Sequence, residues 1–430
     1  MKQMRKLLTI FLCLIFLISG CWDYVEVEEL TLVRTIAIDY LPERRAPYLV
    51  TLAISLPADI AGEKSGSGGG SPTQLFSAVG ATLNLAIEQA SLNLSRRLFF
   101  SHAELILIGE EAAKHGLLHI LDFISNHPQV RFNVDLLITK GFARDVMTTT
   151  ERLEVAITEE MIGMIDQARY SSESDPLQAF EFLQKLVTPG QDAYTALLLK
   201  GPPLEEEIAK LKDEQKPGGQ EESTEGGAGG ANGGGKSEGG SSGSTEDIQE
   251  ILTMAGLAAF QNDKLVGFLN SHETRGLLWF LGKTNRTFLA IENPEKPSET
   301  ISLHVARVQT KIKPHLENGQ ISFSVEVITE GDIRSQTGNT EIFTPEMINK
   351  INSAKAGAIK QEMEKAMRKM QELKVDLVGF GTILYRHDPE TFRLLEEKWP
   401  EEFSKLKVNI VVTSEIRRTG MQSHPARLRR

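Results

Sequence analysis

The stretch ISLHVARVQTKIKPHLENGQISFSVEVITEGDI, residues 301–333, determines the architecture expected for the C-terminal part of the chain. Apolar and polar residues alternate on both sides of Asn318-Gly319, which is typical of two long, half-buried strands joined by a tight turn. Thr344-Pro345 then marks a helix start, and apolar residues recur at helical spacing for about seven turns. Because this helix can cover one face of the hairpin, the pattern predicts an α+β fold with mixed or antiparallel sheets covered by helices.

The N-terminal half shows the same mixture of periods. Further strands are expected at Leu30–Tyr40, Tyr48–Leu56, 103–108, 132–139, 254–260 and 265–269. Amphipathic helices are expected at 74–94 and 110–125. Helices and strands therefore alternate through this part of the chain, which predicts a second sheet with its own core.

Residues 201–246 interrupt the pattern. Acidic residues and lysines give way to 226–243, which consist almost entirely of Gly, Ser, Ala and Asn. Such a composition cannot bury enough apolar surface to fold, so a disordered, acidic, Gly/Ser-rich insertion is expected here.

The insertion suggests the following division of the chain. We expect a signal peptide at 1–20, an N-terminal α/β region at 21–200 with room for most of two domains, the remainder of a middle domain at 247–299, a C-terminal α/β domain at 300–420 and a basic tail at 421–430.

The first 21 residues are typical of a bacterial lipoprotein. Three basic residues precede the apolar stretch Leu7–Ile18, which is shorter than the roughly 20 residues needed to span a membrane. Leu17-Ile-Ser-Gly-Cys21 resembles the lipobox, in which the cysteine receives a diacylglyceryl thioether and becomes the mature N-terminus. We therefore expect lipidation at Cys21, with or without N-acylation. An uncleaved signal anchor is the alternative, and both interpretations place the rest of the chain outside the cytoplasm.

Composition excludes several functions. The formal net charge is −11, and the only charged residues that cleavage would remove are basic, so an acidic surface disfavours nucleic-acid binding. The only other cysteine, Cys13, lies in the predicted signal peptide. Because lipidation would consume Cys21, disulfides, thiolate metal sites and a cysteine nucleophile are not expected.

The histidines do not predict a metal or catalytic site. His115 and His119 are spaced to share a helical face, but no glutamate stands between them in the zincin position. His102 precedes an apolar strand, and we interpret it as a residue that anchors a turn.

The remaining motif residues also have structural explanations. Glu273 and Arg275 lie at a helix start before Gly276, where an acidic first turn is favourable. Trp279 and Trp399 are expected to anchor cores, and Gly379 and Gly381 to form a tight turn. No enzyme activity, cofactor or metal is predicted.

Several stretches occur in an order and spacing that identify a family. They are Gly20-Cys-Trp-Asp23, Ser95–His102, Ile108-Gly-Glu-Glu111, Gly267-Phe-Leu269, Glu273–Trp279, Asp376–Gly381, Trp399 and Ile416–Gly420. With them the chain resembles, over nearly its whole length, the Ger(x)C family, the lipoprotein C-subunits of spore germinant receptors. The Gly/Ser insertion is longer than the family pattern.

The resemblance implies a non-enzymatic, three-domain subunit on the outer face of the spore inner membrane. It implies integral-membrane A and B subunits as partners and small germinants as the signal, and it leaves germinant binding by this subunit open. The candidate structural or interface residues are His102, Glu273, Arg275, Gly276, Trp279, Gly379 and Gly381.

Two other function classes remain open from the residues alone. A solute-binding lipoprotein of a transporter would share the anchor, but it should show two doubly wound lobes with repeated βαβ units. A surface hydrolase would need a carboxylate pair or triad, and the chain is rich in Asp and Glu.

Overall fold

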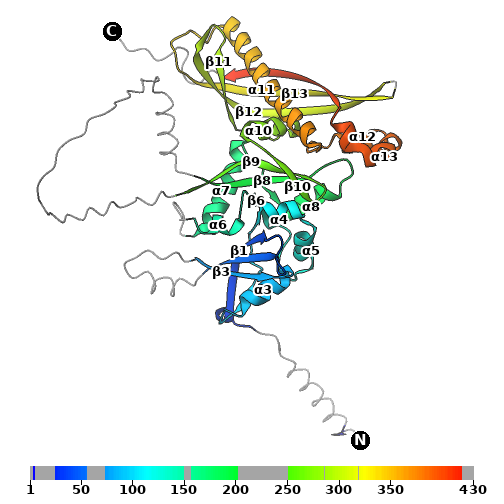
Figure 1. The fold of residues 1–430 in the computed structure, drawn as a ribbon. Helices are drawn as coiled ribbons and strands as arrows, with labels where there is room; N and C mark the ends of the chain where they lie inside the picture. Colours follow the sequence, from blue (N-terminus) through cyan, green and yellow to red (C-terminus); the bar gives the residue numbers. More distant parts are fainter. Residues whose placement is uncertain are drawn as a thin grey trace, which may run out of the picture.

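The computed structural model describes residues 3–4, 25–55, 73–149, 156–201, 250–284, 286–317 and 319–418. Cys21, nearly all of the predicted signal peptide and insertion, and the predicted basic tail lie outside these residues. The described chain forms two β-sheets with helices packed on and between them (Figure 1).

The larger sheet has the strand order β10-β9-β8-β6-β5-β1-β2-β3, with β4 paired to β1 and β7 paired to β6. Its strands are β1 Leu30–Tyr40, β2 Tyr48–Ser55, β3 Thr73–Gly80, β4 Arg97–Phe99, β5 Leu105–Gly109, β6 Asp135–Thr139, β7 Leu177–Gln178, β8 Tyr194–Gly201, β9 Ile251–Gln261 and β10 Lys264–Leu269. Strands β1, β5, β6 and β8 are parallel, and the strands flanking them on the main path are antiparallel. The predicted insertion therefore connects two adjacent antiparallel strands, β8 and β9.

Helices cover both faces of this sheet. They are η1 Val27–Glu29, α3 Leu83–Ser91, α4 Glu110–His115, α5 Leu118–Asn126, α6 Ala143–Met147, α7 Ile157–Ser171 and α8 Ala179–Val187. Helices α3, α4, α5 and α8 share one core with the sheet, and α6 and α7 share another. All five residues of β5 are buried, as expected for a central strand between two covered faces.

The smaller sheet has the order β11-β12-β13-β14. Its strands are β11 Phe288–Asn293, β12 Lys296–Glu317, β13 Gln320–Gln336 and β14 Lys407–Arg418, and only the β13–β14 pair among them is parallel. The accompanying helices are α10 Ser271–Leu281, α11 Pro345–Leu373, α12 Phe380–His387, α13 Pro389–Leu395, η2 Glu396–Lys398 and α14 Trp399–Phe403.

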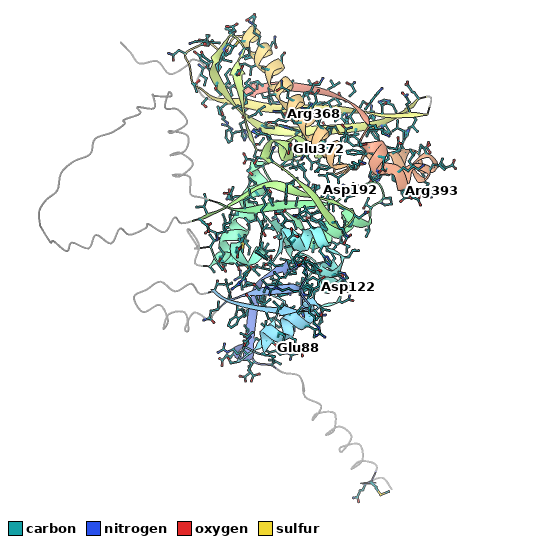
Figure 2. The ribbon with its side chains drawn as sticks, in the orientation of Figure 1. Glu88, Asp122, Asp192, Arg368, Glu372 and Arg393 are labelled. Carbon is teal, nitrogen blue, oxygen red and sulfur yellow. The ribbon has the colours of Figure 1, made fainter. Side chains whose placement is uncertain are left out.

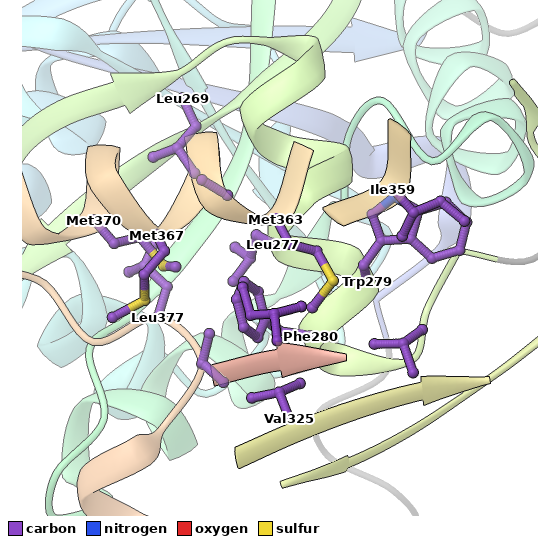
Figure 3. Close-up of a cluster of buried hydrophobic side chains, with 14 of the residues drawn as sticks. Leu269, Leu277, Trp279, Phe280, Val325, Ile359, Met363, Met367, Met370 and Leu377 are labelled. Carbon is purple, nitrogen blue, oxygen red and sulfur yellow. The ribbon is translucent and has the colours of Figure 1, made fainter. Parts of the chain in front are cut away.

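Helices α10 and α11 form the layer between the sheets. Their buried side chains share one core with residues of both sheets, including Leu269 from β10 and Val325 from β13. Figure 3 shows Leu277 and Phe280 of α10 between these strands, with Met363 of α11 beside them. The largest described core therefore joins the two halves of the chain.

Several sequence predictions are confirmed. Strand β1 has the predicted limits Leu30–Tyr40, and β12 and β13 form the long hairpin with Gly319 at a positive φ of 75°. Helix α11 starts at Pro345, and the Thr344 hydroxyl accepts a hydrogen bond from the Met347 amide as its N-cap.

Two helix predictions need correction. Residues 73–80 form β3, so only the second half of the helix predicted at 74–94 exists, as α3. The helix predicted at 110–125 is divided at Gly116, whose φ is 129°. His115 and His119 therefore belong to different helices, and the His115 ring stacks on Tyr40 with 3.9 Å between centroids.

Candidate functional site

The first candidate site is the contact between α10 and α11. A Cβ atom on Gly276 would overlap the backbone oxygen of Glu362 and lie 2.7 Å from the Cβ of Ala366. Only glycine therefore allows the two helices to approach this closely. The close approach places the polar groups of α10 against Glu362.

Arg275 and Trp279 converge on the Glu362 carboxylate. The Arg275 Nε donates to both carboxylate oxygens at 3.1 and 3.0 Å, its second guanidinium nitrogen donates to Oε1, and the Trp279 indole donates to Oε2 at 2.9 Å. The Arg275 and Glu362 side chains are only 11% and 10% exposed. Burial alone would lower the pKa of Arg275, but the Glu362 carboxylate outweighs it and raises this pKa. The arrangement is a buried, bidentate ion pair.

Glu273 lies at the N-terminus of the same helix. Its side chain accepts the Asn270 amide at 2.9 Å, while the Asn270 side chain accepts the Glu273 amide at 3.0 Å. This reciprocal capping box satisfies two helix-end donors. A basic cleft of about 390 Å³ lies beside it, and Figure 2 labels Arg368 and Glu372 from its lining. The other lining residues are His272, Lys365 and Lys369 together with Asn270 and Glu273.

The second candidate site surrounds Asp376. Its Oδ1 accepts the backbone amides of Gly379 and Phe380 at 2.7 and 3.0 Å, and its Oδ2 accepts the Gly381 amide and the Trp399 indole at 2.8 and 3.0 Å. Gly379, at the N-cap of α12, has a φ of 87°, which explains the glycine. Burial raises the pKa of Asp376 to about 7, although each of the four hydrogen bonds acts to lower it.

The Asp376 turn also joins the two sheets. The Asp376 amide donates to Oδ2 of Asp192 at 2.8 Å, and the Asp192 amide donates to the Asp376 carbonyl at 2.9 Å. Burial raises the pKa of Asp192 to about 6. Gly190 lies directly against Gly381, and a Cβ on Gly381 would lie 2.6 Å from the Gly190 Cα. The loop before β8 is thereby fixed to the start of α12.

His102 lies elsewhere, in the exposed turn between β4 and β5. Its ring centroid is 5.8 Å from that of Phe99. The structure therefore groups Glu273, Arg275, Gly276 and Trp279 at one contact and Gly379 and Gly381 at another, and it separates His102 from both.

Sequence reasoning missed Glu362, Asp192 and Lys355. Glu362 is the partner of Arg275, 87 positions away, and Asp192 is the partner of Asp376, 184 positions away. No local sequence pattern connects residues so far apart. Lys355 of α11 is fully buried, and its Nζ has no hydrogen-bond partner among the described residues. Burial lowers the pKa of Lys355 to about 8. The sequence signal for Lys355 is a lysine that falls on the apolar face of the predicted helix.

The polar groups of both sites are engaged in structural contacts. The carboxylates of Glu362 and Asp376 each accept hydrogen bonds from a tryptophan and from further donors. Within the described ranges, no three His, Cys, Asp or Glu side chains gather as a metal site, and no helix has the length and apolar character to cross a bilayer. In both sites these contacts hold the layers around the two sheets together.

Comparison with known proteins identifies the class. Residues 23–199 match the model described as the spore germination protein N-terminal domain, and residues 255–420 match the one described as spore germination B3/GerAC like, C-terminal. The chain belongs to this GerAC-like family, which confirms the resemblance to Ger(x)C proteins. It is a spore germination C-subunit protein, a non-enzymatic class.

Individual relatives match over nearly the full length. The chain is 26% identical to spore germination protein KC of Bacillus subtilis over 98% of each chain, and 25% identical to the putative spore germination protein YfkR of the same organism over 97% of each. The crystal structure of the GerBC protein aligns with a TM-score of 0.51 at 18% identity, covering 91% of this chain and 99% of that one. The chain therefore has a GerBC-like fold.

Proposed function

We propose that this chain is the lipid-anchored C-subunit of a germinant receptor, attached through Cys21 to the outer face of the spore inner membrane and required for nutrient-triggered germination. The end-to-end match to spore germination proteins supports this most directly. The lipobox-like Leu17–Cys21 supports the anchor, and it stands only four positions before the first residue of the described fold, Val25.

In this proposal the mature protein has the three domains expected from the sequence and works beside integral-membrane A and B subunits. The C-subunit contributes a folded surface rather than chemistry. A diacylglyceryl anchor supplies two acyl chains, which suffice for stable attachment, and the anchor raises the local concentration of the protein beside its partners.

Replacement of Cys21 by alanine tests the anchor. We expect the protein to incorporate no labelled fatty acid and to co-purify poorly with the A and B subunits, so that germination slows. Cys13→Ala is the matched control because it changes the other cysteine without removing the acceptor, and it should behave as wild type. Acylation of the Cys21→Ala protein equal to that of the wild type would refute the proposal.

A further inference from the structure

The end of the molecule that follows the predicted anchor exposes apolar and basic side chains. Strand β4 pairs with the first residues of β1, with Arg97 opposite Leu30. Helix α3 ends at Ser91, six positions before β4. Figure 1 shows α3 and the start of β1 at one end of the molecule, with the small sheet and α11 at the opposite end. Figure 2 labels Glu88 of α3 at the first end and Arg393 of α13 far from it.

Helix α3 exposes large apolar side chains at this end. Leu85 of α3 is 46% exposed, and Leu92, the C-cap residue that follows α3 with αR backbone angles, is 73% exposed. Because the C-cap continues the helical geometry, their spacing of seven places them on one face. Glu88 lies on the same face and is also exposed, so this face is amphipathic and carries one acid that opposes the attraction of nearby basic groups to an anionic surface. An amphipathic face suits the headgroup level of a bilayer better than a dry protein interface.

Two arginines follow α3. Arg97 is exposed and Arg96 is half-buried, and neither forms an ion pair with any other described residue. They belong to the Ser95–His102 motif, which neither of the two structural sites uses. Arginine side chains beside exposed leucines are typical of surfaces that bind acidic headgroups, because the stem contacts apolar groups while the guanidinium stays among phosphates.

The covalent anchor places this surface near the membrane. Cys21 is four residues before Val25, and an extended chain spans at most about 3.6 Å per residue, so the Cα of Val25 lies within about 14 Å of the Cα of the lipidated cysteine. The acidic residues Glu28 and Glu29 of η1 are exposed at the same end, with no basic residue in η1, and would be repelled by an anionic surface. The α3 side has one exposed acid, Glu88, but two arginines and two exposed leucines, which favours contact through that side.

We propose that Leu85 of α3 and Leu92 at its C-cap, with Arg96 and Arg97, form a membrane-facing surface that rests on acidic lipid headgroups and orients the anchored protein with its small sheet away from the bilayer. The proposal rests on the lipid anchor proposed above. Its ligand is the lipid surface itself, and contact of the same face with an integral-membrane protein is the competing outcome.

The test uses the full-length acylated protein in vesicles of phosphatidylcholine and phosphatidylglycerol that contain a brominated lipid. Because Cys13 is lost with the signal peptide and the Cys21 thiol is blocked, a fluorophore can be attached at Leu92→Cys alone, or at Leu394→Cys as the distal control, where the native leucine is 84% exposed. We expect a blue shift and strong bromine quenching at position 92 and neither at position 394.

Charge reversal provides the second arm. Each basic residue at an anionic surface increases association about five-fold, so Arg96→Glu/Arg97→Glu should lower the ratio of docked to undocked label at position 92 by at least about 25-fold. In vesicles of pure phosphatidylcholine, the same charge reversal should change the ratio of docked to undocked label only slightly. Equal quenching at positions 92 and 394 on vesicles that carry the protein would overturn the inference, as would protection of position 92 that requires added A and B subunits. If the wild-type protein fails to float with vesicles, the anchor itself is refuted instead.

Discussion

The buried pair between Arg275 and Glu362 makes the joint between the two sheets sensitive to a single charge. Glu362→Gln keeps the size of the side chain but removes the counter-charge of a guanidinium that is only 11% exposed. Removing one partner of a buried ion pair costs about 3–5 kcal/mol. The glutamine oxygen can still accept one hydrogen bond from Arg275 or Trp279, so we expect a loss near the lower end, about 3 kcal/mol.

Thermal unfolding measures this loss. For a folded unit of roughly 150–250 residues, a destabilisation of 1 kcal/mol lowers the Tm by about 2–4 °C, so Glu362→Gln should lower it by about 6–12 °C. Glu372→Gln on the same helix is the matched control. Its partner is Lys369 and its side chain is 69% exposed, so its loss should stay below about 1 kcal/mol.

A double variant separates charge from packing. Arg275→Met/Glu362→Gln removes the stranded cation and keeps an acceptor for the Trp279 indole, so it should recover about half of the stability lost in Glu362→Gln. The reasoning fails if Glu362→Gln melts within about 1 °C of wild type, or if the double variant melts below the single one.

Three further substitutions differ in expected sign: Gly276→Ala in α10, its control Gly163→Ala in α7, and Lys355→Met in α11. Gly276→Ala should destabilise the α10–α11 contact by about 1–3 kcal/mol in denaturant unfolding, because its Cβ would overlap Glu362, whereas Gly163→Ala in α7, where a Cβ meets nothing within 4 Å, should be neutral or stabilising by up to about 1 kcal/mol. Lys355→Met should stabilise the folded protein at neutral pH. Burial lowers the pKa of Lys355 from 10.5 in the unfolded chain to about 8, so the unfolded state binds more protons than the folded state between these pH values. The free energy of unfolding of the wild type therefore falls by about 3 kcal/mol as the pH drops through that window, and the methionine variant does not have this loss. Melting at pH 7 and pH 10 checks this, and an unchanged Tm at pH 7 in the methionine variant would contradict it.

The elements with strong local signals were predictable. The β12–β13 hairpin carries a long alternating pattern around an Asn-Gly turn, and α11 has both a capping threonine and a proline at its first position. In contrast, Leu75, Val79 and Leu83 follow helical spacing and predict a helix where the structure has β3. As an edge strand with half-exposed side chains, β3 shows little alternation, and its pairing with β2 decides its structure.

The sites were predictable only in part. Capping by Glu273 and the turn at Gly379 follow from local rules of helix ends and positive φ. The contact of Gly276 with Glu362, and that of Asp376 with Trp399 and Asp192, depend on segments distant in sequence. The break at Gly116 likewise depends on Asp263, whose carboxylate lies 2.5 Å from where a Cβ would stand.

The positions of the family motifs suggest what this architecture has to maintain. Glu273–Trp279 and Asp376–Gly381 both lie where the small sheet meets the large one, and each contributes a buried carboxylate contact across that boundary. The Ser95–His102 motif lies at the opposite end, at the start of β1.

If one end rests on the bilayer, the joint fixes the height and direction at which the other end is presented. Alternate side chains of β14, from Lys407 to Arg417, are exposed on the outer face of that distal sheet. Loosening the joint by Glu362→Gln should therefore impair assembly with membrane partners even where the anchor and the membrane-facing surface are intact, and co-purification at a temperature below the melting transition separates this effect from unfolding.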